Sequence, residues 1–313
     1  MATTEVERQA EATNRRGLAY GAGAYLLWGL FPLFWPLLEP AGAVEILAHR
    51  IVWSLVVVGG VLLVRRRLAG IAAIGRRRLA LLAAAGVVIG LNWAFYIWGV
   101  NNGHVVETSL GYFVNPLVTV LLGVFVLGER LRRGQWAAVA VGAVAVAVLT
   151  VDYGRPPWIA LVLAFSFGTY GLIKKSVGAG AMESVTVETA TLALPAVAYL
   201  TWLTAAGQSH FGQVSAGHTL LLLATGPVTA VPLLFFGAAA RRLPLTVLGL
   251  LQYLAPVLQF LFGVLLFHEP MPPARLAGFA LVWLALVALT AESLRHQRRR
   301  YVLARAAAAS AAA

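Results

Sequence analysis

The sequence predicts an all-α membrane protein: ten transmembrane helices that form two inverted five-helix repeats, with both termini cytoplasmic. Its composition, the distribution of basic residues among its loops and a repeated motif lead to this fold class. Of the 313 residues, 60% are hydrophobic and only 12% are charged, roughly half the charged share of soluble domains. A water-soluble fold of this length cannot bury so much apolar surface, which excludes a soluble enzyme and a disordered chain.

Ten apolar runs are long enough to cross the bilayer as helices, because a spanning helix needs about 20 mostly apolar residues. A membrane β-barrel would instead show segments of about 10 residues that alternate between polar and apolar side chains. We expect spanning helices at 17–38, 43–64, 79–99, 105–127, 133–151, 157–173, 187–206, 217–239, 243–267 and 274–292.

The basic residues predict the orientation of these helices. Six regions on one side (both tails and alternate loops) contain 21 of the 24 Lys and Arg residues, whereas the five loops on the other side contain only Arg155 and Arg275. Cytoplasmic loops carry the excess of Lys and Arg, so both termini are predicted to be cytoplasmic. Because the basic residues form short clusters between apolar runs, the net charge of +12 indicates membrane topology and not nucleic-acid binding.

A motif of proline, glycine and glutamate occurs twice, 140 residues apart. Its members are Pro116, Gly123 and Glu129, followed by Pro256, Gly263 and Glu269. Each copy lies in a unit of five spans, an odd number, so the second unit must be inverted relative to the first. Inverted repeats are typical of alternating-access carriers. The domains are therefore predicted as a tail at 1–16, repeats at 17–151 and 157–292, and a second tail at 293–313.

Several segments resemble the RarD family of EamA-type proteins, within the drug/metabolite transporter superfamily. They are AYLLWGLFP at 24–32, EILAHRIVWS at 45–54, NW at 92–93, NNGH at 101–104, SLGYFVNP at 109–116, TAVPL at 229–233 and GLLQY at 249–253. The resemblance covers about residues 17 to 292. It implies a ten-helix permease of the plasma (inner) membrane, whose third–fourth and eighth–ninth helices line a central cavity. The family name is associated with chloramphenicol sensitivity.

Polar side chains at membrane depth are the candidate substrate-binding residues, since ionisable and polar groups there need partners or a wet cavity. We expect the cavity to be lined by Tyr112, Asn115, Gln252, Tyr253, Asn92, Tyr96 and Gln259. The alternative for the aromatic residues is a belt at the membrane interface.

Three ionisable residues lie together in the second predicted span. Glu45 and His49 are four residues apart and share a helix face, whereas Arg50 lies roughly 140° around the helix from Glu45. One interpretation is a proton-linked or anion-binding cluster that faces the cavity. The other is a structural network that fixes this helix to its neighbours, and the sequence does not favour either.

The sequence lacks the motifs of the membrane enzymes that would compete with a carrier. It has a single Asp, Asp152, no Cys and no H-E-x-x-H zinc motif, so we expect no catalytic residues, no metal and no cofactor. The segment 207–210 is predicted to be a polar turn and not a nucleophile motif.

The predicted function is thus a secondary transporter for a small polar or amphipathic metabolite or drug. A lipid or amphiphile flippase or scramblase with the same fold is the alternative. The expected partners of this protein are membrane lipid and a small-molecule substrate. Protons are the candidate coupling ion, and the expected assembly is a monomer or weak homodimer.

Overall fold

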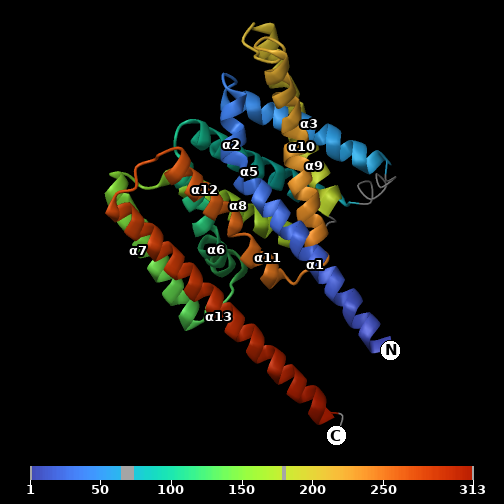
Figure 1. Cartoon of the computed structure of the whole chain (residues 1–313), viewed down its shortest axis with the longest axis vertical. Helices are drawn as coiled ribbons and strands as arrows, with labels where there is room; N and C mark the ends of the chain where they lie inside the picture. Colours follow the sequence, from blue (N-terminus) through green and yellow to red (C-terminus); the bar gives the residue numbers. More distant parts are fainter. Residues whose placement is uncertain (1, 65–73, 178–180, 312–313) are drawn as a thin grey trace.

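The computed structural model describes residues 2–64, 74–177 and 181–311, and the regular structure in these ranges is helical. The predicted basic cluster at 65–67 lies outside the described residues. The elements are α1 (Ala2–Gly29), α2 (Phe31–Phe34), η1 (Trp35–Leu38), α3 (Ala43–Val64), α5 (Arg76–Asn101), α6 (Val105–Leu127), α7 (Arg133–Tyr153), α8 (Trp158–Val177), α9 (Ala181–Ala205), α10 (Ala216–Ala240), α11 (Leu245–Leu251), α12 (Leu254–Leu261), η2 (Phe262–Leu266) and α13 (Pro273–Ala311) (Figure 1).

Within the described ranges, eight helical segments are long and apolar enough to cross a membrane. The count is nine if the first helix and the bent segment after it, Arg15–Gly29 and Phe31–Leu38, form one broken span; their axes differ by 42°. The sequence predicts ten. The difference is α9, which has 25 residues but also several threonines and two glutamates, Glu183 and Glu188, that lower its hydropathy.

Contacts between helices occur in matched pairs. The first half contributes α1, α3, α5, α6 and α7 in order, and the second half contributes α8, α9, α10, α11–α12 and α13. In this order, the contact of α6 with α8 corresponds to that of α12 with α1, and the contact of α5 with α8 to that of α10 with α1. The α3–α10 contact corresponds to α9–α5 in the same way. Exchanging the halves therefore preserves these contacts.

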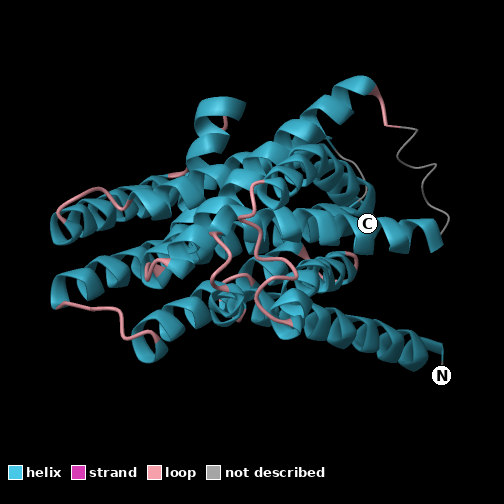
Figure 2. Cartoon of the chain, turned by 90° about the horizontal axis from the view of Figure 1, so that it is seen from above, coloured by secondary structure: helices cyan, strands magenta, loops and turns pink. Residues whose placement is uncertain are grey.

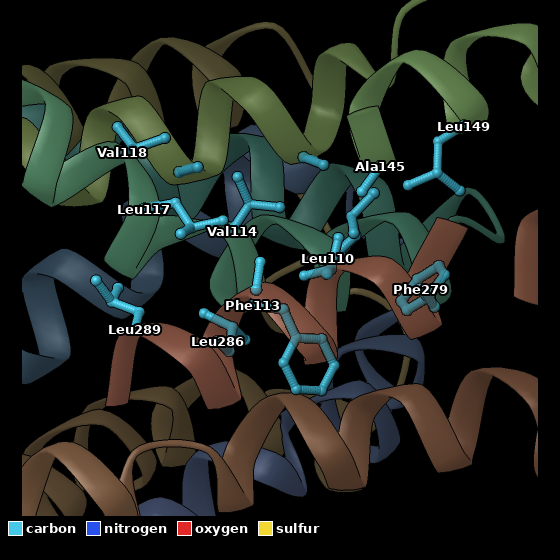
Figure 3. Packing of buried hydrophobic residues seen from close by; sticks show 14 of the residues in the cluster. Leu110, Phe113, Val114, Leu117, Val118, Ala145, Leu149, Phe279, Leu286 and Leu289 are labelled. Atoms are coloured by element: carbon cyan, nitrogen blue, oxygen red, sulfur yellow. The ribbon is translucent and has the colours of Figure 1, made fainter. Parts of the chain in front are cut away.

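The largest apolar cluster joins the fourth and fifth helices of the first half to the last helix of the chain. Phe113 and Leu117 of α6 pack with Leu149 of α7 and with Phe279 and Leu286 of α13 (Figure 3). The ribbon shows α7 and α13 side by side at one edge of the bundle (Figure 1). Several buried polar groups lie outside this cluster, on α3, α5 and α10.

The repeated proline–glycine–glutamate motif forms the same helix end in both halves. The backbone N–H of Glu129 donates to the carbonyl of Gly123 at 3.0 Å, and that of Glu269 donates to Gly263 at 2.9 Å. In each case the residue before the glutamate is left-handed, with φ of 67° and 52°. In both halves the bond therefore spans six positions and closes over a left-handed residue, which is the conformation that commonly ends a helix, and this explains why the glycine and the glutamate have the same spacing in both copies.

Both chain termini lie at the same end of the bundle (Figures 1 and 2). We call this the terminal end, and we call the opposite end the distal end. Because the helices alternate in direction, the distal end is made of the connections at 39–42, 102–104, 154–157, 206–215 and 267–272.

The backbones of the two halves approach closely where α10 crosses α3. A Cβ atom on Gly226 would lie 2.6 Å from both the carbonyl carbon and the carbonyl oxygen of Trp53. We expect Gly226→Ala to destabilise the protein by about 1–3 kcal/mol, as overpacking does, because backbone atoms cannot rotate away. Thermal unfolding in detergent measures this loss.

Gly237→Ala is the matched control on the same helix, because nothing lies within 4 Å of a Cβ atom at that position. Its unfolding temperature should stay close to that of the wild type. Equal melting temperatures for the two variants would contradict the close crossing.

Candidate functional site

Arg50 is a buried cation at the centre of the helix bundle. It is the eighth residue of α3, about 10 Å along the helix from the distal end at 1.5 Å per residue, and only 3% of it is exposed. Its Nε donates to the hydroxyl oxygen of Thr229 on α10 at 2.9 Å. A charged group therefore connects the two halves at membrane depth, where an unpaired charge is costly.

Aromatic rings surround the Arg50 guanidinium. Its Cζ lies 4.0 Å from the ring centroid of Trp93, 5.2 Å from that of Trp35 and 5.5 Å from that of Phe31. A cation over an aromatic face is attracted by the ring quadrupole, most strongly by tryptophan. The rings come from α5, η1 and α2, so the bent segment after α1 contributes two of the three.

Several buried polar atoms in this region have no hydrogen-bond partner. Among the described residues, the atoms without a partner include Nη1 of Arg50, the hydroxyl of Tyr96, Oγ of Ser54 and Nε1 of Trp35. Ser54 is four residues from Arg50 and therefore shares its helix face. The Tyr96 hydroxyl lies within electrostatic range of the guanidinium. All four groups can donate a hydrogen bond, so the arrangement suits an acceptor-rich ligand group.

The structure separates Glu45 and His49 from Arg50. The Glu45 carboxylate accepts from the backbone N–H of His210 at 2.8 Å, and its other oxygen lies 2.7 Å from Nδ1 of that residue. His49 accepts from Nε1 of Trp53 at 3.2 Å and stacks on Phe211 at 5.0 Å. Both residues thus hold the 206–215 connection against α3, and the predicted polar turn supplies the partner of Glu45.

Asn92 links three helices next to the Arg50 region. Its side-chain nitrogen donates to the carbonyl of Leu163 at 3.0 Å and to Oγ of Ser166 at 2.9 Å, both on α8. Its oxygen accepts from the Tyr112 hydroxyl of α6 at 3.2 Å. The ring of Tyr112 lies 5.6 Å from that of Tyr96. Three predicted cavity residues therefore lie together.

Within the described part of the chain, the remaining four predicted cavity residues form no hydrogen bond with these three residues. Asn115 accepts from the Thr119 hydroxyl at 3.5 Å on its own helix. Tyr253 packs against the α6–α7–α13 cluster, and the buried amide of Gln259 donates to the carbonyl of Trp28 at 3.2 Å. Gln252 is half-buried between α11 and α12.

The helix is interrupted at Gln252. Pro256 has no N–H to donate to the carbonyl of Gln252, four residues earlier. The helix ends at Leu251 and resumes at Leu254. In the first half Pro116 stands in the same relation to Tyr112, although α6 continues through it. Tyr112 and Gln252 are therefore equivalent positions 140 residues apart, each with a carbonyl released from the helical ladder.

A small cavity of about 20 Å³ lies beside Trp93, on α5. This is space for about one water molecule. Glu188 and Tyr170 also line the cavity. The Glu188 carboxylate accepts from Nζ of Lys174 at 2.6 Å and from the Tyr170 hydroxyl at 3.0 Å, so this second polar cluster is internally paired.

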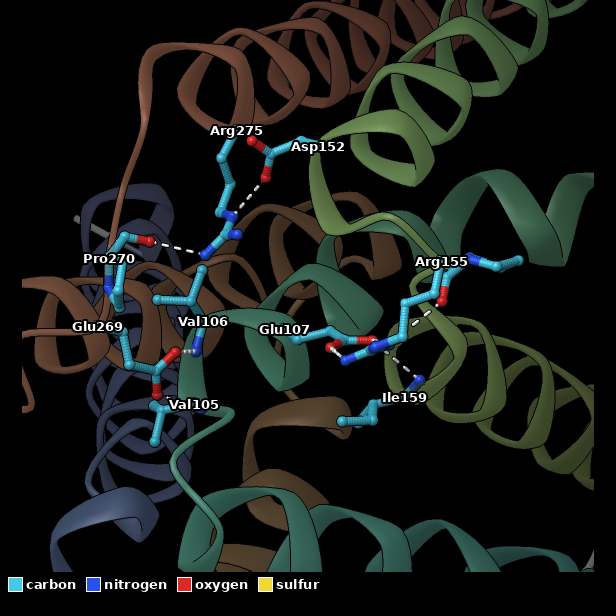
Figure 4. A network of polar contacts seen from close by, with 10 residues as sticks. Val105, Val106, Glu107, Asp152, Arg155, Ile159, Glu269, Pro270 and Arg275 are labelled. Carbon is cyan, nitrogen blue, oxygen red and sulfur yellow. Dashed lines mark hydrogen bonds and ion pairs between the residues drawn. The ribbon is translucent and has the colours of Figure 1, made fainter.

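A network of charged groups joins the connections at the distal end (Figure 4). Both carboxylate oxygens of Glu107, which is 2% exposed, accept from Arg155, at 2.8 and 3.1 Å, and one also accepts from the N–H of Ile159. Arg275 donates to Asp152 at 2.7 Å. These bonds connect α6 to the start of α8, and α7 to the start of α13.

Glu269 binds the first turn of α6 in the same network. Its two carboxylate oxygens accept from the backbone N–H groups of Val105 and Val106 (Figure 4). Burial raises the pKa of Glu269, although these backbone donors and Arg275 lower it in part. Glu129, the equivalent residue at the terminal end, is instead half-exposed and pairs with Lys175 at 3.3 Å. In the described residues, the two ends therefore differ in how these glutamates are bound.

Several site residues were not among the sequence-based candidates, namely Thr229, Trp93, Phe31, Trp35, His210 and Phe211. Thr229, Trp93 and Phe31 lie in the segments that resemble the family, so the signal was present there. His210 and Phe211 lie in a short polar connection that has no such signal. Among the described residues, no three His, Asp or Glu side chains are placed to hold a metal ion.

The Glu107–Arg155 pair yields a test of the distal network. Arg155→Ala leaves a buried carboxylate without its cation, so we expect it to destabilise the protein. The loss should be about 1–3 kcal/mol, below the value for a fully buried pair, because Arg155 is 37% exposed. Chemical or thermal unfolding in detergent measures the loss.

Lys175→Ala removes the cation of an exposed pair at the terminal end and is the matched control. Its effect should stay below about 0.5 kcal/mol, since exposed pairs contribute little. If both alanine variants were equally stable, the network would not hold the distal end together.

Comparison with known proteins identifies a transporter family. The model of the EamA-like transporter family matches residues 15–151. The chain is 63% identical to the protein RarD of Streptomyces exfoliatus, over 96% of both chains. It is 41% identical to the uncharacterized transporter YojE of Bacillus subtilis, over 92% of this chain and 97% of the relative.

A chloramphenicol-sensitive protein RarD of Pseudomonas aeruginosa is 32% identical, over 91% of this chain and 98% of the relative. One solved crystal structure, 20% identical, aligns with a TM-score of 0.57 and covers 87% of this chain and 96% of its own. At this identity the structural match concerns the fold alone.

Proposed function

The chain belongs to the RarD family of EamA-type permeases, and from this premise we propose that it is a secondary carrier. It moves a small polar or amphipathic solute across the plasma membrane by alternating access. The family membership rests on relatives that share up to 63% identity across nearly the whole chain. These relatives support a multi-pass membrane transporter. The solute and the mechanism are what we propose.

The packing of the halves supports the alternating-access mechanism. Helix contacts that are preserved when the halves are exchanged are expected of two inverted five-helix repeats. Such halves can rock against each other and expose a fixed central site first to one side and then to the other. The charge bias of the loops places the termini, and hence the terminal end, in the cytoplasm.

The burial and the unpartnered donors of the Arg50 region support its assignment as the solute site. It is buried at membrane depth, it is built from α2, η1, α3 and α5 of the first half and α10 of the second, and it contains unpartnered donors. Polar groups inside a membrane protein mark substrate or ion pathways. We place the solute there, with Tyr112 and Asn92 at one side and Gln252 at the helix break as the equivalent position in the second half.

The charge pairs support a conformation closed toward the outside. The distal end is joined by Glu107–Arg155, Asp152–Arg275 and Glu45–His210. In an alternating-access cycle these contacts must open for the solute to enter or leave on that side. The pairing of Glu45 with a histidine makes protons the candidate coupling ion. Chloramphenicol joins the candidate solutes because one relative is named for sensitivity to it.

Substitution of the two equivalent site residues tests the proposed carrier. Tyr112→Ala and Gln252→Ala should each reduce solute exchange at least about tenfold, the effect of losing one or two hydrogen bonds to a solute, without reducing the amount of protein in the membrane. The measurement is counterflow in proteoliposomes with labelled amino acids, small organic acids and chloramphenicol.

Tyr20→Ala is the matched control, because Tyr20 is 36% exposed and lies near the terminal end against Phe235. It should exchange solute like the wild type. Wild-type exchange by both site variants would refute the site. Transfer of fluorescent lipid with no exchange of any soluble solute would instead favour a flippase.

A further inference from the structure

We propose that Arg50 recognises a carboxylate group of the transported solute, and that the solute is an organic anion with an apolar or aromatic body. This inference rests on the proposed function, because it assigns a chemical class to the solute of the same site.

Within the described residues, Arg50 forms no ion pair with a carboxylate. The three buried glutamates of the helices, Glu45, Glu107 and Glu188, pair with His210, Arg155 and Lys174 in turn. Among the helices that contact α3, α5 (Arg76–Asn101) and α10 (Ala216–Ala240) contain no acidic residue, and α9 contains Glu183 and Glu188, of which the buried Glu188 is bound by Lys174. A buried arginine whose anion is missing from the protein is stabilised when a ligand supplies one.

The hydrogen-bond donors around Arg50 suit a carboxylate. Nε of Arg50 donates to the Thr229 hydroxyl. Three other donors, Nη1 of Arg50, the Tyr96 hydroxyl and Oγ of Ser54, have no hydrogen-bond partner among the described residues. A carboxylate has two oxygens with about four acceptor positions and no hydrogen to donate. It can therefore satisfy several such donors at once, whereas a neutral amide offers one carbonyl oxygen together with donors of its own, and an ammonium group offers no acceptor.

Aromatic rings form an apolar lining around the guanidinium of Arg50. Trp93 lies against the guanidinium at 4.0 Å and Trp35 lies at 5.2 Å. A guanidinium that stacks on a ring keeps its in-plane N–H groups for bidentate bonding to a carboxylate. The rings exclude water from the ion pair and offer a surface for the apolar body of a solute.

The test compares acids with their neutral amides, which have nearly the same shape. Acetate, hexanoate, benzoate and phenylacetate are added to the purified full-length protein in detergent, and the melting temperature is followed against concentration. We expect benzoate or phenylacetate to stabilise the protein more than acetate, and the amides to have no effect. Arg50→Gln should weaken binding of the acid about 10- to 100-fold, as loss of a charged hydrogen bond does, and Arg50→Lys should weaken it less.

Lys175→Gln at the terminal end is the matched control, because it removes a cation from an exposed pair with Glu129, and it should bind the acid like the wild type. If Arg50→Gln does not fold, Ser54→Ala replaces it, with an expected loss of a few-fold in affinity. The inference is overturned if no acid stabilises the wild type, if amides act like acids, or if Arg50→Gln binds acids normally. Exchange of neutral solutes by a wild type that ignores every acid would overturn this inference while retaining the carrier, whereas absence of any exchange would count against the carrier itself.

Discussion

The membrane interior offers no hydrogen-bond partners to a buried charge, and the polar contacts of this protein follow from that constraint. Glu107 and Glu188 are each buried and each bound to a cation from another segment. Glu45 is bound to a histidine of a connection. Arg50 has instead a threonine and three aromatic rings. The buried charges therefore determine which helices and connections stay together, and in the described part of the chain the Arg50 charge is not matched by an opposite charge.

The same constraint affects helix packing. Lipid tails are as apolar as leucine side chains, so helices gain from close van der Waals contact and not from hiding apolar surface. Small residues at crossings, such as Gly226 against Trp53, allow that contact. Prolines are tolerated where neighbouring groups or a helix break accommodate the freed backbone. Pro256 lies just after the helix break at Gln252, between α11 and α12. The equivalent helix of the first half, α6, continues through Pro116.

The sequence predicted much of the fold and part of the candidate site. The bounds of α3 and α6 coincide with the predicted runs, because a bilayer imposes a long apolar segment that is visible in a single sequence. Asn92 and Tyr96 are four residues apart and share one face of α5, and both contact Tyr112 of α6. Tyr253 packs instead against the α6–α7–α13 cluster. Helical spacing indicates which residues share a face, but it does not indicate which helix that face meets.

By itself, then, the sequence determined the membrane environment, the approximate helices, the repeated proline–glycine–glutamate helix ends and the predicted orientation. All of these depend on local composition and on spacing along one chain. Only the tertiary structure decided that Glu45 pairs with His210, 165 residues away, and that Arg50 meets Thr229, 179 residues away. The spacing within one helix placed Glu45, His49 and Arg50 near one another. Contacts across helices depend on how the two halves pack, and that packing separates Arg50 from the other two.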